Sequence, residues 1–524
     1  MNVIPRPLKL EESTGKINFS SSTEMTGEFD SVRAFAVNML CDVKGEGRNT
    51  VCFKKDDAFE EEEYSIEKRS GDVIVKAKTE KGAFYAVMTM KQLSSGRGYF
   101  ENVKIHDKPK YAYRGFMLDS ARHFWSVDKI KQMIDVMANL KMNVFHWHLT
   151  DDQGWRIEIK KYPLLTEKGS IRKDTPLSLY NYWNNKEEHD GKEYGRGLFY
   201  TQDEAREIVA YAKERQIDVM PEIDMPGHMV AAISCYPHLS CKAEETQVSN
   251  RWGVMDNILC CGNDEVYEFA KDIIDEIVDI FPYKYFHIGG DEVPKKRWKE
   301  CPKCQAKMKE LGLKSENALQ SHFNNVMLKH LNSKGKSMIG WNEILDAQEI
   351  LEPEVIAQWW TNYHPAAAEK AKRWMKSGGK TILSLVNYVY MDHAFAIRPL
   401  SKTYGYSYRT MGLENDDNVA GMEIPQWTEY IRDEEKFDMN TYPRLITFAE
   451  VCWSDDSNKN YEDFERRFEN MRGYFKKSYG FELPHQKVYR GKTTPWYSIN
   501  KNKYWVKDPY FEVKFNRELM KNGK

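Results

Sequence analysis

The 524-residue sequence predicts an α/β protein, a (β/α)8 TIM barrel preceded by a small α+β domain. After about residue 110, apolar runs of strand length alternate with segments of helical period, and eight such runs can be counted. Before that point, short β-like runs are mixed with charged stretches and one helical segment. We therefore expect an N-terminal α+β domain over 1–108, a catalytic barrel over 109–455, and a C-terminal helix and tail over 456–524 that pack on the barrel.

Within the first 108 residues, Val73-Ile74-Val75 is typical of a strand and the segment from Gly82 to Met90 is typical of a helix. The run of four glutamates from Glu60 to Glu63 is expected on a solvated surface. A polar stretch interrupted by Pro109 predicts the linker to the barrel.

The barrel prediction depends on eight strands with helices between most of them. The expected strands are Tyr113–Leu118, Asn143–Leu149, Ile217–Glu222, Tyr283–Ile288, Ser337–Trp341, Val355–Trp359, Thr381–Leu385 and Gly421–Trp427. The clearest expected helices are Val127–Leu140, Thr201–Arg215, Asp264–Ile280 and Ala366–Ser377.

Polar or aromatic residues follow nearly every predicted strand. They are Asp119 and Arg122, Asp151-Asp152, Glu222 with His228, Asp291-Glu292, Trp341-Asn342-Glu343, Trp359-Trp360, Tyr388 to Asp392, and Trp427-Thr428-Glu429. Active sites of such barrels lie at the C-terminal strand ends. Core packing and helix caps do not readily produce this recurrence, so the sequence predicts a polar, aromatic-rich site at that face.

Composition narrows the function classes. Lys and Arg total 77 against 79 Asp and Glu, and this net charge of -2 disfavours nucleic acid or an anionic membrane as a partner. No apolar run approaches the length of a membrane span. The N-terminus lacks the features of a signal peptide, so the chain as it reads predicts a cytoplasmic protein, or a periplasmic or secreted one if an export signal was removed. A homo-oligomer is compatible with the sequence.

Nine cysteines include Cys241, Cys260 and the close pair Cys301 and Cys304. One CxxC pair is weak evidence for zinc, because a structural site needs about four ligands and no second pair follows. Free thiols or a local disulfide are expected there, and no metal or cofactor is predicted. The spacing of His146 and His148 would place both imidazoles on one strand face, but a packed barrel histidine is the better interpretation because no third ligand is evident.

The pair Asp291-Glu292 follows Gly289-Gly290 at a strand end. A lone acidic pair at such a place more often begins a helix than performs chemistry. Two adjacent acids can nevertheless take opposite roles, since an ionised carboxylate raises the pKa of its neighbour. Glycosidic cleavage needs such a proton donor and a negative or nucleophilic partner, and the glycines are expected to leave room for a ligand.

Four motifs in the same order resemble the family 20 glycoside hydrolases, the β-N-acetylhexosaminidases. They are Tyr113-Arg114-Gly115-Phe116-Met117-Leu118-Asp119, the segment from His146 to Trp155, the segment from Pro221 to His228, and His287-Ile288-Gly289-Gly290-Asp291-Glu292. The resemblance extends from the N-terminal domain to about Trp453. It implies an exo-acting retaining β-N-acetylhexosaminidase that removes a terminal GlcNAc or GalNAc from an oligosaccharide or glycoconjugate. It also implies attack by the substrate's own acetamido oxygen, since adjacent carboxylates do not easily bracket a sugar.

The resemblance further implies a role for individual residues. Asp291, ionised, would hold the acetamido N–H, Glu292 would be the general acid and base, and Tyr390 would donate to the acetamido oxygen. Asp151 and His228 would orient Glu292. The remaining predicted contacts are Trp341, Trp359 and Trp427 as walls, and Arg114, Asp392 and Glu429 on the sugar hydroxyls. Choosing Trp359 over Trp360, and Asp151 over Asp152, depends on the alignment alone.

Two other functions remain open at this point. Release of a disaccharide such as lacto-N-biose would need an open pocket, whereas Arg114 and Glu429 together predict a closed one. A noncatalytic carbohydrate-binding barrel should have lost Asp291, Glu292 or Tyr390, and all three are present. The segment from Tyr180 to Gly197 is expected to form part of the rim that selects the glycan.

Overall fold

The computed structural model describes residues 1–40, 49–95, 97–176, 189–350, 355–362, 365–491 and 511–522. Residues 180–188 of the predicted rim segment and residues 492–510 of the predicted tail lie outside the described residues.

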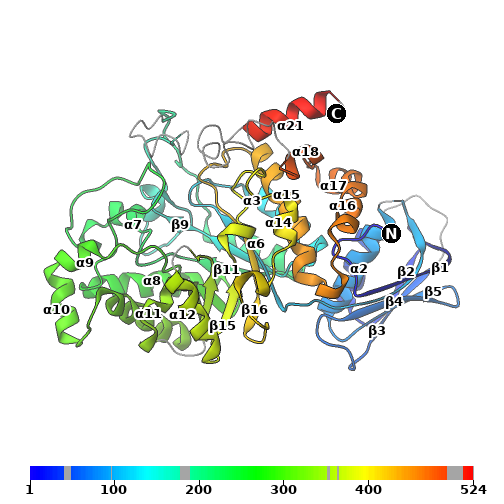
Figure 1. Ribbon diagram of the computed structural model, residues 1–524, viewed down its shortest axis with the longest axis horizontal. Coiled ribbons are helices and arrows are strands. Elements are labelled where there is room, and N and C mark those ends of the chain that lie inside the picture. The colour runs from blue at the N-terminus through cyan, green and yellow to red at the C-terminus, as the bar shows by residue number, and fades with distance from the viewer. Residues whose placement is uncertain are drawn as a thin grey trace.

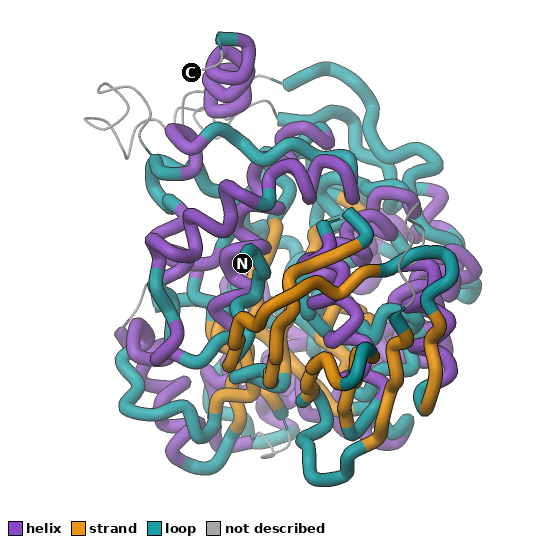
Figure 2. The backbone as a smooth tube through the Cα atoms, turned by 90° about the vertical axis from the view of Figure 1, so that its right-hand side faces the viewer, coloured by secondary structure: helices purple, strands orange, loops and turns teal. Residues whose placement is uncertain are grey.

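The N-terminal part is a mixed sheet backed by two helices, at the right of Figure 1 and facing the viewer in Figure 2. Its strands lie in the order β1-β6-β4-β5-β3-β2. Their bounds are β1 Lys9–Asn18, β2 Glu24–Gly27, β3 Thr50–Lys55, β4 Tyr64–Arg69, β5 Asp72–Ala77 and β6 Tyr99–Asp107. The helices are α1, Asp30–Leu40, and α2, Glu80–Ser94. The strand expected around Val73 is therefore part of β5, and the helix expected from Gly82 is part of α2.

The helix α2 is buried almost throughout, because its apolar residues pack on the sheet while its other side meets the barrel. At this junction the Gln92 side chain donates to the backbone oxygens of Ile4 and Asn139, at 2.6 and 2.8 Å. A buried ion pair joins Lys141 of the barrel to Asp107 at the end of β6, at 3.0 Å. Because both charges are fully buried, each depends on the other for compensation.

The expectation of a solvated glutamate run is wrong for two of its four members. Glu60 and Glu61 are exposed, but Glu63 is buried against His106 at 2.8 Å and Glu62 lies 2.6 Å from the guanidinium of Arg114. The run turns inward where these partners lie, which charge patterning alone does not reveal.

Eight parallel strands close the barrel in the order β7-β8-β11-β12-β13-β14-β15-β16, which confirms the predicted fold. Their bounds are β7 Tyr113–Asp119, β8 Val144–His148, β11 Asp218–Glu222, β12 Tyr285–His287, β13 Ser337–Trp341, β14 Ile356–Trp359, β15 Lys380–Leu383 and β16 Val419–Gln426. A small hairpin, β9 Thr150–Asp151 with β10 Gly154–Trp155, follows β8. All eight expected strands are present, with ends shifted by at most two residues.

The helices around the barrel follow the predicted periodicity, and several begin at side-chain caps. Thr201 caps one of them with a reciprocal hydrogen bond to Glu204. The longer helices are α3 Val127–Asn139, α6 Gln202–Lys213, α8 Asp264–Ile280, α11 Glu316–Ser333, α12 Pro365–Lys376 and α15 Glu434–Trp453. Shorter helical segments in the connections are α4 Leu164–Glu167, α7 Val230–Cys235, η1 Pro237–Leu239, α9 Lys296–Glu300, α10 Pro302–Glu310, η2 Asn342–Ile350, α13 Val386–Val389, α14 Leu400–Tyr404 and η3 Tyr408–Met411.

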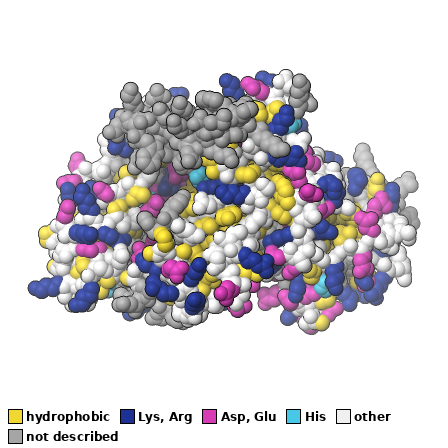
Figure 3. All heavy atoms as spheres, in the orientation of Figure 1, with side chains coloured by type: hydrophobic (Ala, Val, Ile, Leu, Met, Phe, Trp, Pro, Cys, Tyr) yellow, Lys and Arg dark blue, Asp and Glu magenta, His cyan; other side chains and the backbone are white. Residues whose placement is uncertain are grey.

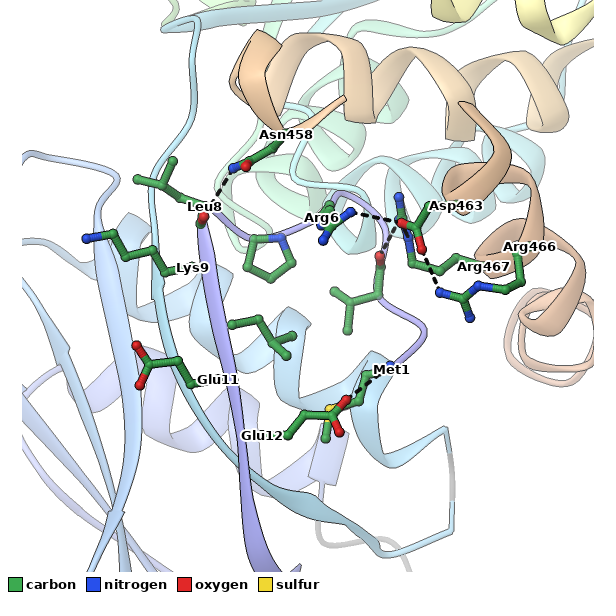
Figure 4. A pocket seen from close by; sticks show the side chains of 13 residues that line it. Met1, Arg6, Leu8, Lys9, Glu11, Glu12, Asn458, Asp463, Arg466 and Arg467 are labelled. Carbon is green, nitrogen blue, oxygen red and sulfur yellow. Dashed lines mark hydrogen bonds and ion pairs between the residues drawn. The ribbon is translucent and has the colours of Figure 1, made fainter. Parts of the chain in front are cut away.

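The C-terminal part consists of short helices, which are η4 Asp456–Asn458, α16 Tyr461–Asn470, α17 Arg472–Tyr479, α18 Gln486–Tyr489 and α21 Phe511–Lys521. In Figure 1, α16 and α17 lie beside the N-terminus, whereas α21 lies at the top of the view. A cavity of about 580 Å³ lies between the first strand and α16. Figure 4 shows its lining, where Asp463 pairs with Arg6, Arg466 and Arg467. Arg467 also pairs with the buried Glu450, at 2.6 Å, so the N-terminal segment and α16 meet at a set of ion pairs.

On the face shown in Figure 3, basic and acidic side chains are interspersed between white polar and yellow apolar surface. Among the helices of the described ranges, none is both long and apolar enough to cross a bilayer.

Candidate active site

A cavity of about 630 Å³ opens at the C-terminal ends of the barrel strands, within the roughly 300–1,000 Å³ that small-molecule sites occupy. Its lining combines acids, a histidine, an arginine and aromatic rings. The residues are Arg122, Asp151, His228, Trp252, Gly253, Val254, Asp291, Glu292, Trp360, Val386, Tyr390, Asp392, His393, Trp427, Glu429 and Tyr430. Eight of the eleven predicted site residues are therefore brought together, and Arg114, Trp341 and Trp359 are not.

The loop after β12 presents Asp291 and Glu292 to this cavity, and its two glycines have a different purpose from the expected one. A Cβ on Gly289 would lie 1.9 Å from the Asp224 carboxylate, and one on Gly290 would lie 2.9 Å from Ile344. Both glycines have positive φ, and the Gly290 N–H donates to Asp224 at 3.0 Å. The glycines thus make room for neighbouring protein groups that shape the loop, and not for a ligand.

Glu292 and His228 also have positive φ, 48° and 50°. Side chains other than glycine rarely take this conformation, which costs on the order of 1 kcal/mol and persists only where the surroundings impose it. Here it aims both side chains at the cavity. The Glu292 side chain remains 39% exposed, whereas that of Asp291 is 11% exposed. The two acids therefore face different environments although they are adjacent in sequence.

Below the cavity, a row of buried charges crosses the barrel. Glu222 Oε2 lies 2.6 Å from His148 Nδ1, and His148 Nε2 lies 3.0 Å from Asp151 Oδ2. Glu222 and His148 are register partners in the β8–β11 ladder, so the sheet itself sets the first contact. Burial disfavours the His148 cation, but Glu222 and Asp151 outweigh it and raise the pKa of His148 well above its usual value.

His228 connects this row to the acidic pair. Its Nδ1 lies 3.2 Å from Asp151 Oδ1 and 3.3 Å from Asp152 Oδ2, while its Nε2 lies 3.9 Å from Asp291 Oδ2 and 3.8 Å from Glu292 Oε2. Burial opposes protonation of His228, but Asp151 outweighs it and raises the pKa of His228. An imidazolium therefore stands between Asp151 and the two acids.

Burial raises the pKa of Asp291 to about 6; the His228 cation opposes this shift and the nearby Glu292 charge adds to it. The predicted anion is thus more basic than an ordinary aspartate, yet still ionised at neutral pH. Asp291 Oδ1 is buried and, within the part of the chain that the structure describes, accepts no hydrogen bond. Asp392 Oδ1 shares this condition, and burial raises the pKa of Asp392 to about 6. Two unpaired acceptors therefore line the cavity.

Aromatic rings wall the cavity, but not all of those predicted. Trp427 lines it as expected, whereas Trp360 replaces Trp359, whose indole is fully buried and donates to Asn362 at 2.8 Å. Successive strand residues face opposite sides, so an error of one position reverses the direction of the ring. The Trp360 ring stacks on that of Tyr390, with centroids 6.1 Å apart.

Trp341 is buried behind the residues that line the cavity, and its role as a wall of the sugar stays a prediction. Its indole packs against the Trp427 ring, with centroids 5.9 Å apart, and donates to Glu222 at 2.8 Å. It supports Trp427 and the charged row from behind. Trp252, which the sequence reasoning did not single out, lines the cavity instead from a loop that carries no strand-end signal.

The assignment of Arg114 to the sugar hydroxyls is wrong. Arg114 is near the start of β7, at the opposite end of the strand from the cavity, and is fully buried between Glu62 and the Tyr85 hydroxyl. Arg122, just beyond the end of β7, lies where Arg114 was expected. It lines the cavity, and its Nη2 lies 2.7 Å from Asp151 Oδ2. The rule that sites occupy C-terminal strand ends would have selected Arg122.

From these positions we expect a change in catalysis when Arg122 is replaced and a change in stability when Arg114 is replaced. We expect Arg122→Lys to lower kcat/KM on an aryl β-N-acetylglucosaminide by about 10- to 100-fold, because one ammonium cannot replace a planar guanidinium that serves both Asp151 and the ligand. The matched variant Arg114→Lys should leave kcat/KM within a few-fold and lower the melting temperature, because it disturbs the buried pair with Glu62. Steady-state kinetics and thermal unfolding measure both, and a kinetic defect confined to Arg114→Lys would contradict the assignment.

Comparisons with known proteins follow the same division of the chain. Residues 111–456 match the glycosyl hydrolase family 20 catalytic domain, and residues 1–108 match domain 2 of that family. A β-hexosaminidase from Porphyromonas gingivalis is 38% identical over 504 residues, which cover 90% of this chain but 62% of the relative. A β-hexosaminidase from Vibrio furnissii is 30% identical over 476 residues, covering 86% of this chain and 76% of the relative. The chain thus spans less than two thirds of the Porphyromonas protein.

Solved structures agree in fold. A β-N-acetylhexosaminidase from Bacteroides fragilis superposes with a TM-score of 0.82 at 31% identity, covering 94% of this chain and 99% of the other. An exo-β-N-acetylglucosaminidase from Vibrio harveyi, in complex with N-acetylglucosamine, gives a TM-score of 0.81 at 29% identity, covering 92% and 78%.

Proposed function

The chain belongs to glycosyl hydrolase family 20, and we propose that it is an exo-acting, retaining β-N-acetylhexosaminidase that releases terminal β-linked GlcNAc or GalNAc. The observation that carries this proposal is the convergence of Asp291 and Glu292 on one imidazole nitrogen, at 3.9 and 3.8 Å. Two carboxylates this close to one atom approach a bound sugar from the same side. They suit a proton donor and an amide-orienting anion better than an acid with an opposing nucleophile.

In this reaction no protein side chain attacks the sugar. Family 20 enzymes are known for this substrate-assisted mechanism, and we propose it for this chain because the chain belongs to the family. Glu292 protonates the glycosidic oxygen while the acetamido oxygen attacks C1, so the C1–O bond breaks and an oxazolinium ring forms. Asp291 accepts the hydrogen bond of the acetamido N–H, and its negative charge balances the positive charge of the oxazolinium ring. Glu292 then takes a proton from water, which attacks C1, opens the ring and restores the acetamido group with retained configuration.

Other lining residues suit the remaining parts of the sugar. The Tyr390 hydroxyl would donate to the acetamido oxygen, and the rings of Trp427, Trp360 and Trp252 would enclose the methyl group and the sugar faces. Arg122, Asp392 and Glu429 would hold hydroxyl groups through charge-assisted hydrogen bonds. Burial raises the pKa of Glu429 to about 7 although Arg122 opposes this, so near neutral pH Glu429 can either donate a hydrogen bond to a hydroxyl or accept one.

His228 is proposed as a positioning residue. Its Nε2 lies 3.8 Å from Glu292 Oε2 and its Nδ1 is held by Asp151, so it is placed to orient the Glu292 carboxylate.

An inhibitor tests the mechanism. A GlcNAc thiazoline resembles the oxazolinium ring, and we expect it to inhibit competitively and far more tightly than free GlcNAc, because a site shaped for an intermediate binds its analogue best. Free GlcNAc is a suitable control because it is the reaction product and lacks the fused ring. Equal inhibition by the two compounds would count against acetamido participation.

Release of lacto-N-biose is the competing activity within the family. It requires space where the 3- and 4-hydroxyls would otherwise meet protein, and we propose that Arg122 and Glu429, which line the cavity, form that wall. The prediction of a closed pocket therefore persists with Arg122 in place of Arg114. A panel of aryl β-GlcNAc, β-GalNAc and lacto-N-bioside substrates separates these activities, and failure of all three would favour a noncatalytic carbohydrate-binding barrel.

Domain bounds at 108 and 455, and assembly into a homo-oligomer, remain proposals. Strand β6 ends at Asp107 and β7 begins at Tyr113, which supports a boundary between them. Limited proteolysis and light scattering test the two proposals.

A further inference from the structure

Four cysteines outside the cavity gather into one cluster. The sulfur atoms of Cys241, Cys260, Cys301 and Cys304 all lie within 4.8 Å of one another. In the sequence, Cys301 and Cys304 form a close pair with no second pair nearby, but the structure brings Cys241 and Cys260 beside them. Cys241 and Cys260 come from the loop after β11, too far away in sequence for any ligand spacing to reveal them.

The distances between the sulfur atoms fit four sulfurs around one zinc ion better than they fit a disulfide. Cys260 lies 3.6 Å from Cys304 and 3.7 Å from Cys301, and Cys241 lies 3.9 Å from Cys304. A disulfide would need about 2.05 Å. A zinc ion with Zn–S bonds of about 2.3 Å holds its tetrahedral sulfurs about 3.8 Å apart. These three separations, of 3.6, 3.7 and 3.9 Å, match this tetrahedron edge.

The backbone around the cluster is built for close approach. A bridge between Ser240 and Leu259 places Cys241 and Cys260 side by side. A Cβ on Gly262 would lie 2.3 Å from the backbone nitrogen of Cys304, so only glycine allows the two loops to meet. Cys260, Cys301 and Cys304 are buried, and Cys241 is half-buried.

Polar backbone groups also face the cluster. Cys301 precedes α10 and Cys304 lies in its first turn, where backbone N–H groups have no partner within the helix. The Gly262 backbone adds a hydrogen bond to the Cys260 sulfur. Four such sulfurs without a cation would repel one another once ionised, whereas a divalent ion would compensate them.

We propose that Cys241, Cys260, Cys301 and Cys304 bind one Zn²⁺ ion as a closed structural site. Four protein ligands leave no position for water, so the ion takes no part in hydrolysis. It joins the loop after β11, which carries His228, to the segment after β12, which carries Asp291 and Glu292. In Figure 1 the helices of this segment, α9 and α10, lie at the left end of the molecule, far from the N-terminal sheet. The ion would therefore tie together the two loops that supply the acid and its positioning histidine.

The metal content of the untagged wild-type protein tests this directly. After extensive dialysis, we expect about one zinc per chain by inductively coupled plasma mass spectrometry, and X-ray absorption at the zinc edge should show four sulfur neighbours at about 2.3 Å. Protein without zinc whose four thiols are all alkylated after unfolding would overturn the proposal. An intact mass lower by two hydrogens for each disulfide formed among these cysteines would also overturn it, as would iron bound in place of zinc.

Two variants locate the ion. Cys301→Ser/Cys304→Ser should lose the zinc and unfold at a lower temperature, while Cys235→Ser, a buried cysteine outside the cluster, should keep one zinc per chain. If the double variant does not fold, mercurial titration of the wild-type protein replaces it: zinc should be released in step with modification of these four cysteines, identified by peptide mapping. Retention of zinc after their modification would place the ion elsewhere.

Discussion

Replacing Glu292 with glutamine is expected to lower kcat on an aryl β-N-acetylglucosaminide by about 10²- to 10⁴-fold, the range that general acid–base catalysis contributes. The amide keeps the shape of the side chain but can neither protonate the glycosidic oxygen nor accept a proton from water. Because the Glu292 side chain is 39% exposed, the fold should tolerate the change.

Leaving groups separate the two duties of Glu292. A substrate with a strongly acidic phenol needs little protonation, so its first step should suffer less in the variant than that of a chitooligosaccharide. Glu300→Gln is a matched control, since Glu300 is exposed at the end of α9 and outside the cavity. Near-native turnover of both substrates by Glu292→Gln would remove Glu292 from the acid role.

Replacing Asp291 with asparagine should lower kcat by about 10²- to 10³-fold, the loss typical of removing one preorganised electrostatic contact to the transition state. The anion that balances the oxazolinium charge is then absent. The same variant should be more stable than the wild type at pH 7. Burial raises the pKa of Asp291 from 3.8 to about 6, so the folded state pays for the carboxylate once it ionises.

The sign of this stability difference depends on pH. Below about pH 3.8, Asp291 is protonated in both the folded and unfolded states and contributes no difference; as pH rises to 6 the unfolded chain ionises first, and the wild type loses stability. Above pH 6 the asparagine variant should exceed it by about 1–3 kcal/mol. Thermal unfolding from pH 4 to 8 measures this.

Kinetics should show the same titration in the wild type as an acid limb of kcat/KM near pH 6. Asp392 also has a pKa of about 6, so Asp392→Asn is the necessary control. If the acid limb is unchanged in Asp291→Asn but disappears in Asp392→Asn, the titrating group is Asp392, and the prediction for Asp291 is contradicted.

Much of the barrel is predictable from local pattern. Each strand buries a short apolar run and each helix repeats its apolar residues with helical period, so both can be located from neighbouring residues alone. The wrong predictions concern side chains whose direction is set by a contact with a distant part of the chain. Arg114 lies at the start of β7 and Arg122 just beyond its end, so the strand-end rule favours Arg122, but the partner that buries Arg114, Glu62, comes from a distant part of the chain and is seen only in the structure.

The order of the strands, the polar residues that end them and the adjacency of Asp291 and Glu292 follow from the sequence alone, because they depend on residues next to one another in the chain. The inward face of Trp360, the convergence of two acids on His228 and the meeting of four cysteines came only from the tertiary structure. Each of these depends on distances between segments that lie tens of residues apart, and such distances are set by how the barrel closes and its loops pack, which local periodicity does not encode.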